Sequence, residues 1–312
     1  RHGLPLEGAV GRRGLSVADL LERHPCDLAD PRVRRLVAGR RVLVTGAGGS
    51  IGSEMARLVA TLRPSRLALV DNGEYALWSV DRTLREADLD ADLEVVPIVA
   101  DVRDAGRIAR VFAAERPDVV LHAAALKHVP LSEANPCEAV LTNALGTAVV
   151  AEAALAAGVG VFVLVSTDKA VDPSGVMGAS KRLAELYCQS LDRAEARSGT
   201  TRWVSVRFGN VMGSTGSVIP LFERQIAAGG PVTVTHPDMR RYFMTIDEAC
   251  GLVLLAAALA AVDADDDIAR GAIFELDMGA PLAVLDLART LIVLAGRRPE
   301  IDVAIQIGRA HV

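Results

Sequence analysis

The sequence lacks the patterns that mark several large classes of protein. Its four cysteines, Cys26, Cys137, Cys188 and Cys250, are scattered and include no Cys-x-x-Cys pair. This excludes a disulfide framework and favours reduced, mostly buried thiols. No spacing of histidine, cysteine, aspartate or glutamate predicts a metal site. The net charge is −5 and the basic residues form no long cluster, so we expect no binding to nucleic acid.

Long apolar runs are also missing. The longest, Cys250 to Val262, has 13 residues and suits a buried helix better than a membrane span. No secretory signal is visible, so we expect a cytoplasmic, globular chain. The chain begins at Arg1, and residues 307–312 resemble a translated sequencing adapter. We therefore expect a fragment with a non-native tail.

From residue 39 onward, apolar runs of strand length alternate with helical stretches. The apolar runs are 41–46, 66–71, 93–101, 118–124, 159–166 and 202–208. Helices are expected from about Ser50, from about Glu74, and from Gly175 to about Arg197. Continuous apolar strands between helices indicate a parallel sheet covered on both faces. The predicted fold class is α/β, a doubly wound parallel sheet of the Rossmann type.

The alternation loosens after Arg207, where glycine and proline become more frequent. We expect an arm or linker at 1–38 and an NAD-binding Rossmann domain at 39–206. A smaller substrate-binding region, interleaved with the sheet, is expected at 207–306 and the tail at 307–312.

A glycine-rich turn follows the first strand. Glycines at 46, 49 and 52 permit a tight turn, close approach to a pyrophosphate and packing of helix on strand. Asp71, which ends the next strand, suits the adenosine ribose hydroxyls and would repel a 2′-phosphate. This favours NAD over NADP; a structural turn with a capping Asp71 is the alternative. The residues expected here are Gly46, Gly49, Ser50, Ile51, Gly52 and Asp71.

Two further strand ends are candidates for the cofactor. Asp101, with Val102 beside it, could bond the adenine or cap the next helix, and the sequence leaves both open. The small residues after the fourth strand would let the cofactor lie against the strand end, although close packing explains them too. They are Ala123, Ala124 and Ala125. His122 is expected to be a packed polar residue.

The fifth strand runs into Ser166, Thr167, Asp168 and Lys169. Ligands of such sheets gather beyond the carboxyl ends of the strands. A hydroxyl, an acid and an amine in succession can donate, accept and relay protons. Taken alone, Asp168 and Lys169 equally suit a surface ion pair.

The following helix places Met177 and Lys181 on one face, at i and i+4. Many nicotinamide enzymes carry Tyr-x-x-x-Lys at this point, with tyrosine as acid or base. The thioether of Met177 cannot transfer a proton, so either another group does so or the chain is not an enzyme.

Several long motifs together resemble one family. They are TGAGGSIGSE, HAAALKHVPLSEANP, STDKAV, VMGASKR, VRFGNVMGSTGSVIPLF and GGPVTVTHPDMRRYFMT. They resemble the bacterial nucleotide-sugar 4,6-dehydratases of the polysaccharide-biosynthesis branch of the extended short-chain dehydrogenases, most of all the UDP-N-acetylglucosamine 4,6-dehydratases. The resemblance covers residues 17 to 298. In this branch a Thr-Asp-Lys cluster stands in place of the usual serine, and methionine can replace the tyrosine.

The resemblance implies roles for individual residues. Thr167, Asp168 and Lys169 would form the active cluster beside Met177, with Asp168 as general acid and Lys169 as general base. Lys181 would bind the nicotinamide ribose. Arg241 would face the substrate diphosphate, a role that suits its permanent charge and its fork of donors. The implied substrate positions are Lys127, His128, Asn210, Ser217, Val218 and Arg241.

The activity implied is conversion of UDP-N-acetylglucosamine, or a close UDP-sugar, to its 4-keto-6-deoxy form with NAD as cofactor. A UDP-sugar 4-epimerase is the alternative within enzymes, and a non-catalytic NAD sensor or scaffold is the alternative from another class. Family members carry membrane helices and a further domain upstream. We therefore expect the full-length protein to be anchored to the cytoplasmic face of the inner membrane. We also expect it to be a homo-oligomer.

Overall fold

The structure, a computed structural model, describes residues 30–87, 93–194, 201–214, 216–261 and 270–308. These residues form two compact units. The larger unit contains the described parts of 25–217 and 242–280, and the smaller unit contains 218–241 and the described part of 281–312.

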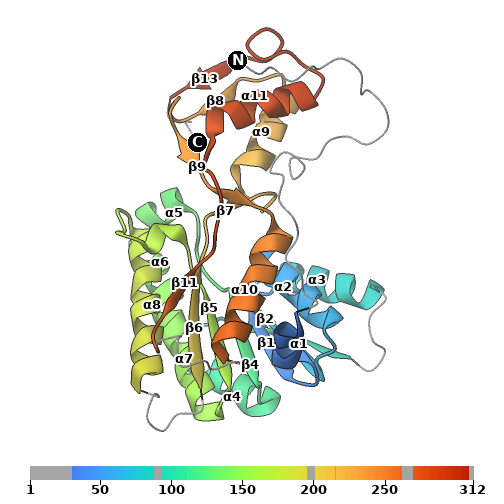
Figure 1. The fold of residues 1–312 in the computed structure, drawn as a ribbon, viewed down its shortest axis with the longest axis vertical. Helices are drawn as coiled ribbons and strands as arrows, with labels where there is room; N and C mark the ends of the chain where they lie inside the picture. Colours follow the sequence, from blue (N-terminus) through green and yellow to red (C-terminus); the bar gives the residue numbers. More distant parts are fainter. Residues whose placement is uncertain (1–29, 88–92, 195–200, 215, 262–269, 309–312) are drawn as a thin grey trace. The chain divides into compact units, whose positions relative to one another are not determined.

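A parallel sheet of seven strands forms the centre of the larger unit (Figure 1). Its strand order is β11-β6-β5-β4-β1-β2-β3, and every neighbouring pair is parallel. The strands are β1 (Arg41–Thr45), β2 (Arg66–Asp71), β3 (Glu94–Val99), β4 (Val119–His122), β5 (Val161–Val165), β6 (Arg202–Arg207) and β11 (Ile273–Glu275). The order reverses between β1 and β4, as in a doubly wound fold.

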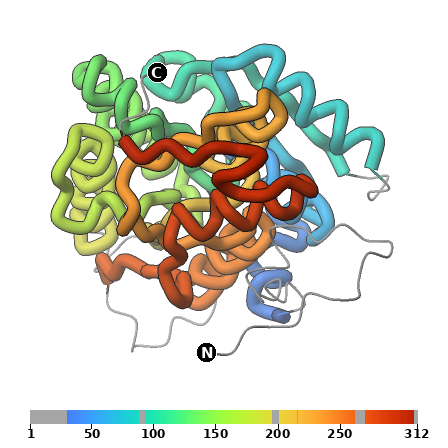
Figure 2. Tube along the Cα trace, turned by 90° about the horizontal axis from the view of Figure 1, so that it is seen from above, coloured from blue at the N-terminus to red at the C-terminus, as the bar shows by residue number. Residues whose placement is uncertain are grey.

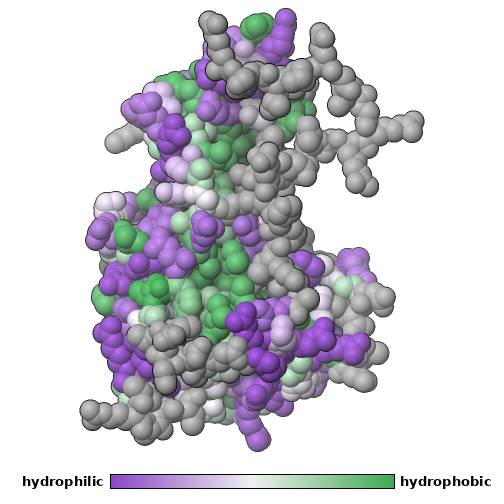
Figure 3. Space-filling view, in the orientation of Figure 1, coloured by the Kyte–Doolittle hydropathy of each residue, from purple (hydrophilic) through white to green (hydrophobic). Residues whose placement is uncertain are grey.

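Helices cover both faces of this sheet (Figures 1 and 2). One face carries α1 (Pro31–Val37), α2 (Ser50–Thr61), α3 (Glu74–Glu86) and α10 (Ile246–Ala261). The other carries α4 (Ala105–Glu115), α7 (Gly146–Ala157) and α8 (Val176–Ala194). Two apolar cores result, one containing Met55 and Leu254 and the other Phe112 and Phe162, all fully buried. On the visible face of the larger unit, apolar residues gather in the region of α10 and β11 (Figure 3).

Short elements complete both units. The larger unit also has α5 (Val129–Ala134), α6 (Pro136–Val140), the π-helical η2 (Leu141–Leu145), the 3₁₀ turn η3 (Asp168–Ala170) and the parallel pair β7 (Asn210–Val211) and β10 (Phe243–Met244). The smaller unit has α9 (Val218–Ala227), α11 (Val284–Leu294), and the pairs β8 (Val232–Val234) with β13 (Ile305–Ile307) and β9 (Arg240–Arg241) with β12 (Leu282–Ala283).

The predicted fold class is confirmed, and the six expected apolar runs are β1 to β6. The boundaries differ from the expectation. Part of the expected linker forms α1, whose Val33 and Val37 are fully buried. Residues 207–217 and 242–280 lie in the larger unit, because α10 and β11 complete its helical layer and its sheet. Within the expected tail, Ile307 pairs with Val234, and residues 309–312 lie outside the described residues.

One helical segment of the described chain, 136–157, is long and apolar enough to cross a membrane by length and composition alone. Polar residues interrupt the segment, which hid it from a search for continuous apolar runs. Its Asn143, Thr147 and Ala151 are fully buried, and Ala151 belongs to the core on one face of the sheet. One side of the segment therefore packs into the larger unit.

The carboxyl ends of three strands are level. Thr45 on β1 pairs with His122 on β4, and His122 pairs with Leu164 on β5. The loops that follow, 46–49, 123–128 and 166–169, therefore begin side by side at one edge of the sheet. Parallel folds bind their ligands at this edge.

At the opposite edge, a buried carboxylate joins three elements. Asp192, on α8, is fully buried. Its oxygens accept hydrogen bonds from the backbone N–H groups of Trp203 (3.0 Å) and Gly271 (2.6 Å) and from Arg202 (3.0 Å) and Arg270 (3.1 Å). The two arginines balance the charge, so α8, β6 and the segment before β11 are held together.

We expect Asp192→Ala to lower the free energy of unfolding by about 3–5 kcal/mol, because it removes the acceptor of two backbone N–H groups and the carboxylate that pairs with Arg202. Asp286→Ala is the control: Asp286 is 74% exposed and lies 3.8 Å from Arg289. Its loss should cost at most about 1 kcal/mol. Urea unfolding of both variants checks this, and equal small losses would contradict it.

Candidate active site

The turn after β1 brings two stretches of backbone together. Gly46 has φ +65°, and a Cβ on it would lie 2.6 Å from the backbone of Ala124. A Cβ on Gly52 would lie 2.0 Å from the carbonyl oxygen of Gly46. The first hydrogen bond of α2 runs from the N–H of Ser53 to Gly49 (2.8 Å). The N–H groups of Ile51 and Gly52 precede it in the first turn of α2, the end of a helix at which anions bind.

A hollow of about 320 Å³ lies at this helix end, lined by Gly48, Ser50, Ser53, Glu54, Ile246 and Asp247. The first turns of α2 and α10 both border it, so two helix dipoles contribute positive potential. Arg57 pairs with Glu54 (Nε to Oε2, 2.8 Å) and lies 3.8 Å from Asp247. The single arginine offsets one of the two negative charges, and the two helix ends add the positive potential that a diphosphate needs.

Asp71 lies between this turn and the start of α3. Its carboxylate accepts hydrogen bonds from the N–H groups of Gly48 (2.9 Å) and Gly73 (2.8 Å). Gly73 is the N-cap residue of α3, so Asp71 bonds the start of that helix, as the alternative of a capping role predicted. Each carboxylate oxygen retains a lone pair for a ribose hydroxyl. The turn, the hollow and Asp71 therefore fit the adenosine diphosphate half of NAD.

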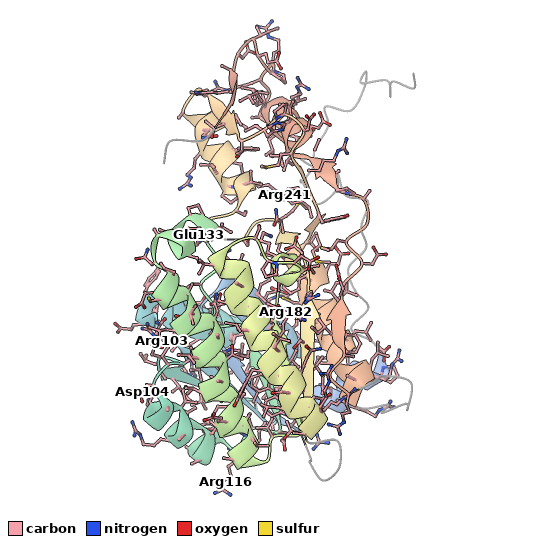
Figure 4. The ribbon with its side chains drawn as sticks, turned by 90° about the vertical axis from the view of Figure 1, so that its left-hand side faces the viewer. Arg103, Asp104, Arg116, Glu133, Arg182 and Arg241 are labelled. Atoms are coloured by element: carbon pink, nitrogen blue, oxygen red, sulfur yellow. The ribbon has the colours of Figure 1, made fainter. Side chains whose placement is uncertain are left out.

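Asp101 does not cap the helix that follows it, which was one of the two roles that the sequence left open. The N-cap of α4 is Asp104, which accepts from the N–H of Arg107 (2.8 Å), so the capping alternative for Asp101 is wrong. Asp101 pairs with Arg103 (2.6 Å), whose hydrogen bonds lower the pKa of Asp101. Arg103 also forms an ion pair with Glu138 on α6 (2.7 Å). Arg103 and Asp104 are labelled in Figure 4. Contact of Asp101 with an adenine stays a prediction, as does that of the buried Val102.

His122 is a packed polar residue, as predicted. It is fully buried, with Nδ1 2.6 Å from the hydroxyl of Thr45 and Nε2 3.0 Å from that of Thr147. Burial and the charge of Lys181 lower the pKa of His122 to about 3. Beyond it, Ala123 donates its N–H to Thr45 (3.1 Å), and the strand end continues through Ala124 and Ala125.

The predicted acid–base residues come together at η3. The hydroxyl of Thr167 donates to Oδ1 of Asp168 (2.9 Å). The amine of Lys169 donates to the same oxygen (2.9 Å) and to Oδ1 of Asn210 (3.1 Å). Asp168 also donates its backbone N–H to Phe208 (3.0 Å). The side chains of Lys169 and Asp168 are 36% and 26% exposed and connect to β7, so they are more than a surface ion pair.

Helix α8 presents Met177 and Lys181, both buried. Burial lowers the pKa of Lys181 to about 8. Its ammonium is thus partly desolvated, which favours a polar ligand beside it. On α5, Glu133 accepts the N–H of Val176 (2.7 Å) and fixes the start of α8 (Figure 4).

Gly178 lets α8 touch the turn η3. A Cβ on Gly178 would lie 2.1 Å from the carbonyl oxygen of Lys169 and 3.1 Å from Cβ of Pro173. No side chain larger than hydrogen fits there without movement of the backbone. The separation of Met177 and Lys181 from the Asp168–Lys169 pair is therefore set by contact of backbone with backbone.

A second buried carboxylate, which the sequence analysis missed, lies beneath the cluster. Glu185, on α8, accepts from the hydroxyl of Ser166 (2.6 Å), from Arg207 (2.6 and 2.7 Å) and from Arg182 (3.0 Å). Burial alone would raise the pKa of Glu185, but these hydrogen bonds outweigh it and lower the pKa. The sequence signal that could have pointed to Glu185 is its position, four residues after Lys181 on the same helix.

Asn143 in η2 was also missed. Its amide accepts the N–H of Leu126 (2.7 Å) and donates to the carbonyl of Leu126 (3.0 Å) and to Ser180 (2.9 Å). It thereby ties the loop after β4 to the helix that carries Lys181. Only the three-dimensional arrangement joins these distant residues.

Four of the predicted substrate residues lie in the larger unit. Burial lowers the pKa of Lys127, and its amine lies 3.5 Å from the hydroxyl of Ser214. The ring of His128 packs against Gly216, where a Cβ would lie 2.5 Å from Cε1. The hydroxyl of Ser217 is buried and has no hydrogen-bond partner among the described residues. The fourth, Asn210, contacts Lys169.

The other two predicted substrate residues lie in the smaller unit. Val218 begins α9, and Arg241 lies exposed on β9, where it donates to the carbonyl of Arg240 (3.1 Å). Figure 4 labels Arg241. The structure describes these residues within their own unit, so their roles stay predictions.

Within the described ranges, no group of three or more His, Cys, Asp or Glu residues could hold a metal. Cys188 and Cys250 are buried free thiols, as expected, whereas Cys137 is exposed and Cys26 lies outside the described residues. Burial raises the pKa of Cys188 to about 12.

A family model described as "Polysaccharide biosynthesis protein" matches residues 42–309. The chain is 49% identical over 292 residues to the capsular polysaccharide biosynthesis protein CapD of Staphylococcus aureus, covering 94% of this chain and 47% of CapD. The chain spans about half the length of the first curated relatives it matches.

Two further comparisons bear on the chemistry. A UDP-glucose 4-epimerase of Rickettsia rickettsii (strain Sheila Smith) is 39% identical over 220 residues, covering 70% of this chain and 62% of the epimerase. The structure of DesIV, a dTDP-glucose 4,6-dehydratase from Streptomyces venezuelae with NAD and TYD bound, is similar with a TM-score of 0.71. Its identity is 26%, covering 86% of this chain and 85% of DesIV.

The contact at Gly178 can be tested by stability. Gly178→Ala should lower the free energy of unfolding by about 1–3 kcal/mol, because the added methyl overpacks against Lys169. Gly106→Ala, in the first turn of α4, is the matched control, since its nearest neighbours are side-chain atoms at 3.6 Å. That change should be neutral or stabilise by up to about 1 kcal/mol. Urea unfolding compares them; two similar values would show that α8 does not touch η3 as described.

Proposed function

The chain belongs to the polysaccharide biosynthesis protein family, and from this premise we propose that it is an NAD-dependent 4,6-dehydratase of UDP-N-acetylglucosamine or a closely similar UDP-sugar. One observation carries the proposal: a hydroxyl, an acid and an amine are joined at η3, where Asp168 lies 2.9 Å from both Thr167 and Lys169. Removal of water from C5 and C6 needs a base for one proton and an acid for the departing hydroxyl.

The cofactor site supports this assignment. The first turn of α2 and the hollow beside it would hold the pyrophosphate of NAD, and Asp71 the adenosine ribose. Lys181, whose pKa burial lowers to about 8, would bond the nicotinamide ribose. When bound, NAD supplies the acceptor for the C4 hydride and the donor that returns it at C6.

The first step needs a base for the C4 hydroxyl, which Met177 cannot provide. We propose that Thr167 contacts this hydroxyl and passes its proton on to Asp168, to which it donates a hydrogen bond of 2.9 Å. Asp168 is then protonated and is the acid for the next step. One carboxyl group thus serves both steps, and Met177 contributes an apolar wall.

In the second step, the C4 ketone acidifies the C5 proton, and Lys169 removes it in its neutral form. Asp168 donates its proton to the C6 hydroxyl, and water departs. When hydride adds at C6, the ammonium of Lys169 returns a proton to C5. Both side chains end in their starting states, so the products are water and the 4-keto-6-deoxy sugar.

An epimerase is the second candidate, because a relative at 39% identity carries that name. An epimerase shares the oxidation at C4 but needs no acid and base for C5 and C6. The Asp168–Lys169 pair therefore favours dehydration. A sensor or scaffold would bind NAD without turnover, and the polar cluster at η3 gives such a protein no evident benefit.

Incubation with UDP-N-acetylglucosamine should give a 4-keto-6-deoxy sugar, followed by NMR, without net accumulation of NADH. A C6 methyl signal and loss of the C5 proton into D₂O are the expected signatures. Recovery of a C4 epimer with an unchanged C6 would replace the dehydratase with the epimerase. Saturable binding of NAD with no change in any UDP-sugar would favour the sensor.

Asp168→Asn should lower kcat by roughly 10²-fold or more, the scale of a positioned acid or base. Because Asp168 also receives the C4 proton, the variant should form no transient NADH in a single turnover. Asp172→Asn, the same change at an exposed position in the same loop, is the control and should keep its activity. Normal transient NADH with a block only at water loss would restrict Asp168 to the C6 step.

A further inference from the structure

We propose that Asn210 is a positioning residue for the general base: its neutral amide oxygen and the carboxyl group of Asp168 together hold the Lys169 amine so that its lone pair faces the substrate. This inference rests on the proposed function. It gives Asn210 a role that its expected contact with substrate does not include.

The geometry of the amine carries the proposal. The Nζ atom of Lys169 lies 2.9 Å from Oδ1 of Asp168 and 3.1 Å from Oδ1 of Asn210. A neutral amine has two N–H groups and one lone pair. The two acceptors occupy both N–H groups, so the lone pair points in a remaining direction of the tetrahedron. A single acceptor would leave the amine free to rotate about its hydrogen bond.

The backbone holds Asn210 in place relative to this amine. Asn210 pairs with Phe243 across β7 and β10, and its N–H donates to the carbonyl of Tyr242 (3.2 Å). Two residues earlier, the carbonyl of Phe208 accepts the N–H of Asp168 (3.0 Å). Both acceptors of the amine therefore belong to one hydrogen-bonded backbone framework.

The neutrality of Asn210 is as important as its position. A carboxylate in place of this amide would favour the charged ammonium of Lys169, which cannot act as a base. The other charged groups on the same segment and on the nearer ends of α8 and β6 are Asp172, Lys181, Arg182, Glu185 and Arg207; Asp192, Arg193 and Arg202 lie at the far ends of α8 and β6. Glu185 is bound by both arginines of this set, so its charge is compensated.

Asn210→Asp keeps the shape of the side chain and adds one negative charge. Dehydration requires neutral Lys169, so the acid limb of the pH profile of kcat should move upward by about 1–3 pH units. At neutral pH kcat should fall tenfold or more, and it should recover at higher pH. Asn135→Asp adds the same charge at an exposed helix cap outside the site and should leave the profile unchanged.

Asn210→Ala is the second variant. It removes the acceptor without adding charge, so kcat should fall about tenfold with the acid limb in its original position. Titration with NAD should show unchanged cofactor affinity in both variants. If Asn210 only binds substrate, both variants will raise KM at every pH and leave the profile of kcat as in the parent, which would overturn the proposal.

Failure of the proposed function gives a different result. In that case the parent protein forms no 4-keto-6-deoxy product from the UDP-sugar by NMR. If the parent forms the normal product and the pH profile of kcat is unshifted in Asn210→Asp, only the proposed role of Asn210 is refuted, and the proposed function stands.

Discussion

The arrangement of the site depends on one buried charge. Glu185 has no exposed surface, and a carboxylate in such a place must be fully paired or it destabilises the fold. Its partners stand next to the functional groups in sequence: Ser166 precedes Thr167, and Arg207 lies three residues before Asn210. By satisfying Glu185, the chain fixes the ends of β5 and β6 against α8.

Close contact of backbones sets the remaining distances. At Gly46 and Gly52 the turn packs so tightly that a methyl group would collide with main-chain atoms, and at Gly178 the same holds between α8 and η3. Such contacts are stiffer than contacts between flexible side chains. The half of the site that fits the cofactor and the half that carries the acid and base are each built on a contact of this kind.

The sequence predicted those features whose signal is local. Alternating apolar runs give the sheet, and a glycine turn followed by Asp71 gives the cofactor edge. Features that depend on tertiary packing escaped prediction. The helix cap at Asp104 in place of Asp101 is a difference of three residues, α1 lacked a strong pattern, and the clamp of Asn143 on Leu126 joins residues that only the fold brings together. The contact of Lys169 with Asn210 likewise needs β7 placed beside η3.

The buried hydrogen bonds around His122 can run in one direction only. Thr147 gives its hydroxyl proton to the carbonyl of Asn143 (2.7 Å), so Nε2 of His122 must donate to Thr147 and Nδ1 must accept from Thr45. The imidazole is therefore locked as a single tautomer, and its low pKa keeps it uncharged at neutral pH. The protein thus places an aromatic ring with no net charge under the cofactor edge, and Lys181 supplies positive charge there without competition from the histidine.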